Sequence, residues 1–100
     1  MKTVIVRYRV KPGMAAENER LCHAVYVELH AKPLAGVRYQ THKLPDGVSF
    51  VHLAAYDGPG DNPLVQLASF KAFVAGIRER CDEPPVNLAT EMVGYFSSAS

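Results

Sequence analysis

Hydrophobic and polar residues alternate at the start of the chain. Between Thr3 and Val10 every second residue is valine or tyrosine, and the intervening positions include two arginines. A period of two is that of a β-strand. After Lys11–Gly13, apolar residues recur at steps of three and four, which predicts an amphipathic helix that ends near Ala31. The first third of the chain is therefore expected to be a strand followed by a helix.

A β-hairpin is predicted for the middle of the chain. Two strand-like segments, 37–44 and 48–56, flank the sequence Pro45-Asp46-Gly47. Proline presets one turn position and glycine accepts a positive φ at another. A three-residue loop closed by a bulge at Gly47 would fix the register of the two strands. The pairs expected from that register are His42 with Phe50, Gln40 with His52, and Arg38 with Ala54.

A glycine- and proline-rich segment, 57–61, separates the hairpin from the next helix and is expected to be a mobile lid. Asn62 and Pro63 are typical of an N-cap and a first helical residue. They predict a short helical turn through Leu67, followed by a second helical start at Ser69.

Pro84 and Pro85 are expected to end this second helix, with a last strand over 86–96 and a disordered tail over 97–100. The fold class is then α+β: one ferredoxin-like β-α-β-β-α-β domain over residues 1–96 with a four-stranded antiparallel sheet. Two helices can cover only one face of that sheet. Because both faces look suited to burial, a second copy of the chain is expected to cover the other, giving a homodimer.

Composition excludes several classes of function. The 100 residues carry 11 Lys and Arg against 10 Asp and Glu, a net charge of +1, with no concentrated basic stretch. Nucleic acid and membranes are therefore not expected as partners. No long apolar run indicates a signal peptide or membrane span, so the protein is expected to be cytoplasmic. Cys22 and Cys81 lack the spacing of a zinc or redox motif, and no metal site is predicted.

Three stretches carry a resemblance to a known family: VIVRYRVKPGM at the start, FVHLAAYDG at the end of the hairpin, and SFKAF in the second helix. In these stretches the chain resembles the antibiotic biosynthesis monooxygenase-like domains of the dimeric α+β barrel superfamily. The resemblance covers nearly the whole chain. It implies a homodimer joined sheet to sheet, with a ligand cavity between each sheet and its own helices.

The resemblance does not imply one activity, since relatives include cofactor-free oxygenases, haem-degrading enzymes and isomerases. Haem degraders of the group would place an asparagine near Arg7, a tryptophan near Tyr56 and a histidine near Val74. None of the three is present here, so no cofactor is expected. What the resemblance carries over is the approximate location of the site, at Arg7 and Tyr56.

Polar side chains are expected to share one face of the sheet. Strand parity and the predicted register gather His52, Arg7 and Tyr56 there as candidate catalytic residues. His52 could move a proton, Arg7 could hold an oxyanion, and Tyr56 could donate a hydrogen bond. The candidate substrate-binding residues on the same face are Arg9, Arg38, Gln40, His42 and Phe50.

Three interpretations of this polar face remain open: a ligand cavity, polar contacts across the dimer interface, or exposure to solvent. The corresponding function is a small-molecule cavity protein that oxygenates an aromatic or enolisable substrate without a cofactor. The alternatives are a non-catalytic ligand-binding protein and a purely structural homodimer.

Overall fold

Four antiparallel strands form one sheet in the order β2-β3-β1-β4. The structure is a computed structural model that describes residues 1–98, so part of the tail predicted at 97–100 lies outside the described residues. The β-α-β-β-α-β order confirms the ferredoxin-like α+β fold. The elements are β1 (Lys2–Val10), α1 (Ala15–Ala31), β2 (Val37–Lys43), β3 (Ser49–Tyr56), the 3-10 helix η1 (Pro63–Gln66), α2 (Ala68–Ala75), α3 (Ile77–Arg80) and β4 (Cys81–Thr90).

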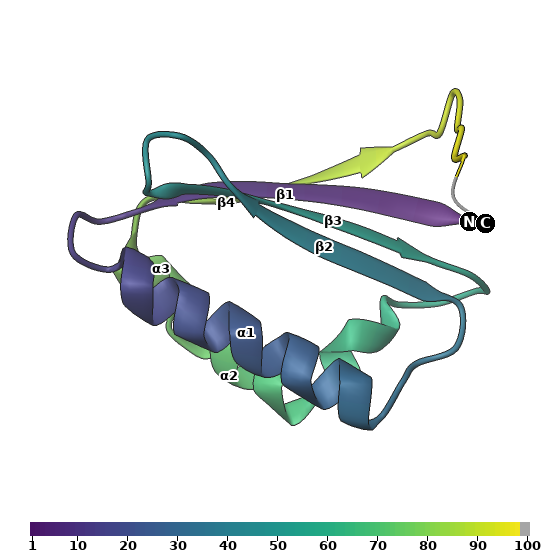
Figure 1. The fold of residues 1–100 in the computed structure, drawn as a ribbon, viewed down its shortest axis with the longest axis horizontal. Helices are drawn as coiled ribbons and strands as arrows, with labels where there is room; N and C mark the ends of the chain where they lie inside the picture. Colours follow the sequence, from purple (N-terminus) through teal and green to yellow (C-terminus); the bar gives the residue numbers. More distant parts are fainter. Residues whose placement is uncertain (99–100) are drawn as a thin grey trace.

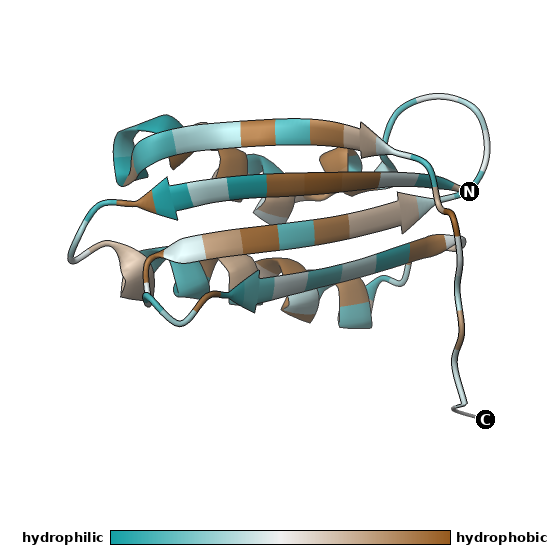
Figure 2. Cartoon of the chain, turned by 90° about the horizontal axis from the view of Figure 1, so that it is seen from above, coloured by the Kyte–Doolittle hydropathy of each residue, from teal (hydrophilic) through white to brown (hydrophobic). Residues whose placement is uncertain are grey.

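The helices all pack on one face of the sheet (Figure 1). Buried side chains from the sheet, α1 and η1 meet between the two layers, among them Val10, Val25, Phe50 and Leu64. No helix of residues 1–98 covers the other face, which is seen directly in Figure 2. The segment that follows β4 runs past the end of that uncovered face and leaves Val93 and Phe96 largely exposed.

The hairpin register differs by one residue from the predicted register. His42 pairs with Val51, Gln40 with Leu53 and Arg38 with Ala55. The cause is the turn, because the Asp46 carboxylate accepts hydrogen bonds from the backbone N–H groups of Val48 and Ser49 and from the Ser49 hydroxyl. Val48 is thereby held inside the loop. A slip of one residue moves every side chain of a strand to the opposite face.

The last strand begins at Cys81, five residues before the predicted start at Val86, and ends at Thr90. Pro84 and Pro85 therefore lie inside a strand and do not end a helix. They are tolerated because β4 is an edge strand, and because two β4 residues face one β1 residue there: Arg7 pairs with Val86 and Arg9 with Glu83. A bulge on an edge strand is one of the few places where a sheet accepts proline.

The helical segments after the hairpin follow the sequence prediction more closely. The Asn62 side chain accepts a hydrogen bond from the backbone N–H of Leu64 and so caps η1, with Pro63 as its first residue. The next helix begins at Ala68, one residue before the predicted start. It is interrupted at Gly76, so that α2 and α3 are separate segments.

Candidate functional site

A row of four side chains crosses the helix-covered face of the sheet. The pairing places Thr41 beside His52, His52 beside Val6, and Val6 beside Asn87. In the neighbouring row, Tyr39, Ala54 and Val4 lie side by side in the same way. Because Val4, Val6 and Ala54 are small, the helices above this part of the sheet do not fill the space.

The resulting cavity has a volume of about 440 Å³ and lies between the sheet and the α2–α3 segments. Most of its wall is apolar, with polar groups from Tyr39, His52 and Asn87 on the sheet side and from Arg78 on α3. An apolar pocket with a few convergent polar groups is typical of a small-molecule site. The remaining lining residues are Val4, Val6, Ala54, Asn62, Leu64, Val65, Phe70, Phe73, Val74, Ile77 and Pro85.

His52 is the central polar group of the cavity wall, and both of its ring nitrogens are hydrogen-bonded. Nε2 lies 2.8 Å from the Tyr8 hydroxyl, while Nδ1 lies 2.6 Å from the Tyr39 hydroxyl and 3.1 Å from that of Thr41. The side chain is 4% exposed. Burial lowers the pKa of His52 from 6.5 to about 4, so the ring is neutral at physiological pH.

The two tyrosines on either side of His52 are also held as neutral groups. Burial raises the pKa of Tyr8 and of Tyr39 well above the usual range of a phenol. Beyond Tyr8, the side-chain amide of Asn18 on α1 donates to the Tyr8 hydroxyl at 2.8 Å, and Arg80 donates to Asn18 at 3.2 Å. The site is therefore an uncharged hydrogen-bonded group, with a buried arginine at its far end.

Of the eight residues predicted for the site, only His52 lines this cavity. Arg7, which lies opposite Val51 and Val86, points to the uncovered face and is exposed, so it does not meet His52. Successive residues of a strand point to opposite faces, and Val6 is the β1 residue paired with His52, so the neighbouring Arg7 points away from it. Arg9 shares that face, where it pairs with Glu83 at 3.2 Å.

The three β2 candidates are exposed on the uncovered face as well, because of the one-residue slip in the hairpin. Arg38 and Gln40 line a separate hollow there, together with Met92 and Tyr95 of the C-terminal segment, and the Arg38 guanidinium lies 5.9 Å from the Tyr95 ring. His42 lines neither this hollow nor the cavity beside His52.

Phe50 and Tyr56 are on the same side of the sheet as His52 but outside the cavity. Phe50 is a core residue stacked on Tyr8, with ring centroids 5.6 Å apart. Tyr56 is buried at the end of the sheet, where it pairs with Lys2 and Val37 and lies under the Lys2 ammonium at 5.8 Å. The structure thus separates Tyr56 from His52.

Sequence reasoning missed the residues that contact His52. The predicted strand parity and register would place Tyr8 and Tyr39 on the face opposite His52, and the sequence pattern does not single out Asn18. One signal was present for Asn18: it lies four residues after Met14 and four before Cys22, inside the apolar stripe of the first helix. An amide at such a position is buried and needs polar partners.

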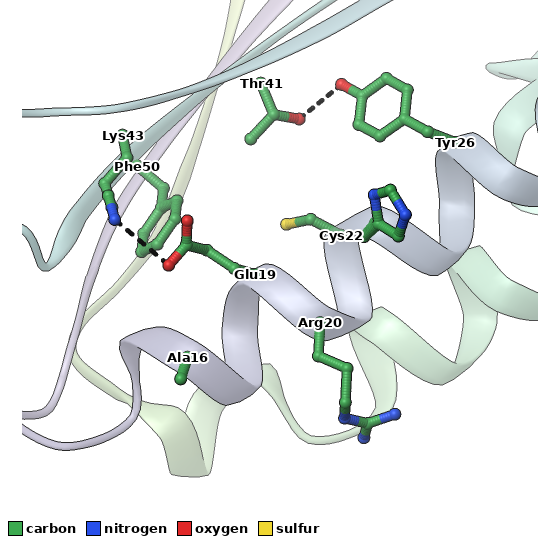
Figure 3. A pocket seen from close by; sticks show the side chains of 9 residues that line it. Ala16, Glu19, Arg20, Cys22, Tyr26, Thr41, Lys43 and Phe50 are labelled. Atoms are coloured by element: carbon green, nitrogen blue, oxygen red, sulfur yellow. Dashed lines mark hydrogen bonds and ion pairs between the residues drawn. The ribbon is translucent and has the colours of Figure 1, made fainter.

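A second, more open hollow lies between α1 and the β2–β3 hairpin, with a volume of about 540 Å³ (Figure 3). Tyr26 and Thr41 point toward one another across it and are hydrogen-bonded at 2.7 Å. Glu19 pairs with Lys43 at its rim at 3.2 Å. Cys22 reaches its wall, and burial raises the pKa of that thiol to about 11, which keeps it in the unreactive protonated form.

Within residues 1–98, no three His, Cys, Asp or Glu side chains are grouped as metal ligands would be. In the same part of the chain, no helix has both the length and the apolar character needed to cross a membrane.

The buried neutral His52 predicts a specific dependence of stability on pH. The pKa of His52 is lower in the folded protein than in the unfolded chain, so its contribution is complete above pH 6.5 and is lost as the pH falls toward 4. The unfolding free-energy difference between wild type and His52→Gln should shrink by roughly 3 kcal/mol from pH 7.5 to pH 4. Urea unfolding of both proteins measures it. A difference that stays constant across this range would contradict the neutral buried ring.

No known family model matches the chain, and no curated protein matches it. Several solved structures are similar to the chain. The chain is similar to an antibiotic biosynthesis monooxygenase with 16% identity and a TM-score of 0.73, over 94% of this chain and 100% of that one. A protein of unknown function from Nitrosomonas europaea shares 19% identity with a TM-score of 0.75, over 99% and 95%.

A candidate antibiotic biosynthesis monooxygenase, also from Nitrosomonas europaea, is 17% identical with a TM-score of 0.76, over 92% of this chain and 89% of that one. At such identities the similarity establishes the fold. The chain therefore has the fold of these antibiotic biosynthesis monooxygenase-like proteins.

Proposed function

We propose that the protein binds an aromatic or enolisable small molecule in the cavity beside His52 and oxygenates it with dioxygen, without a cofactor. The observation that carries the proposal is the set of rings around the polar end of the cavity. Tyr39 and His52 are stacked with centroids 5.7 Å apart, Phe73 lies 5.4 Å from His52, and Phe70 lies 6.3 Å from Phe73. Such walls favour a flat aromatic ligand.

The polar groups of the cavity suit a ligand with an oxygen that carries negative charge. The Tyr39 hydroxyl can donate to an enolate or phenolate oxygen in the cavity. Arg78 adds a positive charge on α3, and within residues 1–98 no carboxylate forms an ion pair with it. The Asn87 amide offers a further hydrogen bond. An anion would therefore be more stable here than in a purely apolar pocket.

The reaction that fits this arrangement converts an activated CH₂ group to a carbonyl. The substrate loses a proton to give an enolate, which passes one electron to dioxygen. The resulting radical and superoxide combine in a new C–O bond. Cleavage of the O–O bond with loss of water leaves the carbonyl, so that one CH₂ and one O₂ become one C=O and one H₂O. The predicted role of His52 as the base is weakened by its low pKa, so the substrate must itself be acidic.

A second candidate function, ligand binding without turnover, is favoured by the hydrogen bonds on both nitrogens of His52. Anthrone, a flat tricyclic ketone with an acidic CH₂, separates the two. Equilibrium binding is measured by fluorescence without oxygen, and oxygen uptake is then recorded against a protein-free control. Uptake of one O₂ per anthrone supports oxygenation, binding without added uptake supports the second candidate, and absence of binding rejects both.

A homodimer joined through the uncovered sheet face belongs to the same proposal. That face carries half-buried Ile5, Val51 and Leu53, and Val86 and Leu88 are 52% and 50% exposed. Val93, Tyr95 and Phe96 of the adjoining C-terminal segment are more exposed still. Exposed apolar side chains gathered on one face are typical of an interface between proteins.

Leu88→Glu is expected to convert the dimer to a monomer, because it places a charge among the exposed apolar side chains of the uncovered face. Val27→Glu is the matched control, since Val27 on α1 is 56% exposed and lies on the opposite side of the molecule. Sedimentation velocity at micromolar concentration measures both. A wild-type protein that sediments as a monomer would overturn this part of the proposal.

A further inference from the structure

A continuous series of side-chain hydrogen bonds runs through the core from Arg80 to the cavity. Arg80 Nε lies 3.2 Å from Asn18 Oδ1, and Asn18 Nδ2 lies 2.8 Å from Tyr8 Oη. The Tyr8 oxygen lies 2.8 Å from His52 Nε2, and His52 Nδ1 lies 2.6 Å from Tyr39 Oη. The first four of these side chains are buried, and the last lines the cavity. We call this series the Arg80–Tyr39 chain.

The donors and acceptors of the Arg80–Tyr39 chain can be assigned from its arginine end. A guanidinium only donates, so Asn18 must turn its oxygen to Arg80 and its NH₂ group to Tyr8. The Tyr8 oxygen is then an acceptor. Its own proton has a nitrogen at 2.8 Å on His52 and a sulfur at 4.0 Å on Cys22, and the short contact to nitrogen is the stronger hydrogen bond.

The assignment fixes the position of the single ring proton on neutral His52. Nε2 accepts from Tyr8, so the proton is on Nδ1, and Nδ1–H donates to the Tyr39 oxygen at 2.6 Å, with Thr41 as the longer contact at 3.1 Å. The second hydrogen-bond partner of the Tyr39 hydroxyl is Thr41, whose oxygen also contacts Tyr26 at 2.7 Å and His52 Nδ1 at 3.1 Å. An acceptor in the cavity therefore competes with this shared Thr41 oxygen for the Tyr39 proton.

Arg80 is held in one position, so the donor-to-acceptor direction of the Arg80–Tyr39 chain is fixed by the packing around Arg80. It is 5% exposed, donates from Nη2 to the Phe73 carbonyl at 2.8 Å, and lies 5.2 Å from the Phe73 ring centroid. Space for it comes from Gly76, where an added Cβ would be only 3.3 Å from Arg80 Nη1. No carboxylate in the described part of the chain pairs with it, so Asn18 is its principal side-chain acceptor.

We propose that Arg80, Asn18 and Tyr8 are positioning residues that hold His52 as its Nδ1–H tautomer, so that Tyr39 presents a hydrogen-bond donor to the cavity. The cavity then selects ligands that carry an acceptor, a carbonyl or enolate oxygen. The ligand preference rests on the proposed function, whereas the His52 tautomer is a property of the ligand-free protein.

The test uses Asn18→Asp, which should reverse the direction of the hydrogen bonds between Asn18 and Tyr39. A carboxylate accepts from both neighbours, so Tyr8 donates to Asp, His52 donates from Nε2 to Tyr8, and Tyr39 donates to His52 Nδ1 instead of to the ligand. The ring nitrogens of ¹⁵N-labelled His52 are read by NMR in the ligand-free protein. The wild type should show a protonated Nδ1 and an unprotonated Nε2, and the variant the opposite. Gln66→Glu is the matched control: it makes the same amide-to-carboxylate change at an exposed position outside the Arg80–Tyr39 chain and outside the cavity lining, and should keep the wild-type tautomer.

The ligand preference is measured with 1-acetonaphthone, which has a carbonyl acceptor, and naphthalene, which has none. The affinity ratio of the two probes should fall about tenfold in Asn18→Asp and remain unchanged in Gln66→Glu. A protonated Nε2 in the wild type overturns the proposal even if the variant does not fold, and so does an unchanged tautomer in a folded variant. If the tautomer is as stated but the wild type binds neither probe, the proposed function and the ligand preference fail while the positioning role stands.

Discussion

Ala54→Phe is expected to abolish ligand binding while leaving the protein folded. Ala54 is 6% exposed and lies between Val4 and Tyr39 in the sheet, so that a ring at this position enters the cavity of about 440 Å³. The dissociation constant for anthrone should rise at least about a hundredfold, because the new ring occupies the space that the ligand needs.

Stability provides the second measurement for this substitution. In a filled core, an added ring costs about 1 to 3 kcal/mol through strain. Over an empty cavity the cost should be close to zero, and urea unfolding measures the difference. Ala72→Phe on the exposed side of α2 is the matched control and should bind anthrone as the wild type does. Strong destabilisation with unchanged binding would mean that the ligand site is elsewhere.

Tyr39→Phe is expected to cause the largest loss of turnover. The substitution keeps the ring stacked on Tyr26, with centroids 5.2 Å apart, and removes only the hydroxyl that donates into the cavity. Loss of one donor to a developing oxyanion typically lowers kcat about a hundredfold or more. Affinity for a carbonyl ligand should fall about tenfold. Steady-state oxygen uptake and equilibrium binding give the two values.

Tyr56→Phe is the informative comparison for Tyr39→Phe. The sequence predicted Tyr56 as the hydroxyl donor, whereas the structure places it at the end of the sheet, outside the cavity lining. Nearly wild-type activity in Tyr56→Phe together with a large loss in Tyr39→Phe would assign the donor to Tyr39. The reverse result would contradict the site described above and restore the prediction from sequence.

The fold could be predicted from sequence because it depends on signals that span many residues. Alternation over 3–10 and the helical period over 14–31 each repeat several times, so that single exceptions do not change the assignment. The residue at which a strand begins or ends depends on far fewer positions. Pro84 and Pro85 normally end regular structure, and only the position of β4 at the sheet edge, known once all four strands are placed, makes them acceptable within it.

The candidate site could not be predicted to the same degree, because it depends on the length of one hairpin loop. The Asp46 side chain holds one additional residue in the hairpin loop, and this decides whether Gln40 or Thr41 lies beside His52. Sequence patterns allow both registers. His52 was identified, but its partners Tyr8 and Asn18 come from elements far apart in the sequence, and their contact follows only from the packing of α1 on the sheet.

The two edge strands have a consequence for how copies of the protein aggregate. β4 carries Pro84 and Pro85, which lack the N–H group that a further strand would need, and β2 carries the exposed charged residues Arg38 and Lys43. Both features discourage the addition of strands from other molecules. The sheet is thus closed to open-ended growth along its edges, while its uncovered face stays available. Concentrated protein is therefore expected to form discrete pairs and not amyloid-like fibres.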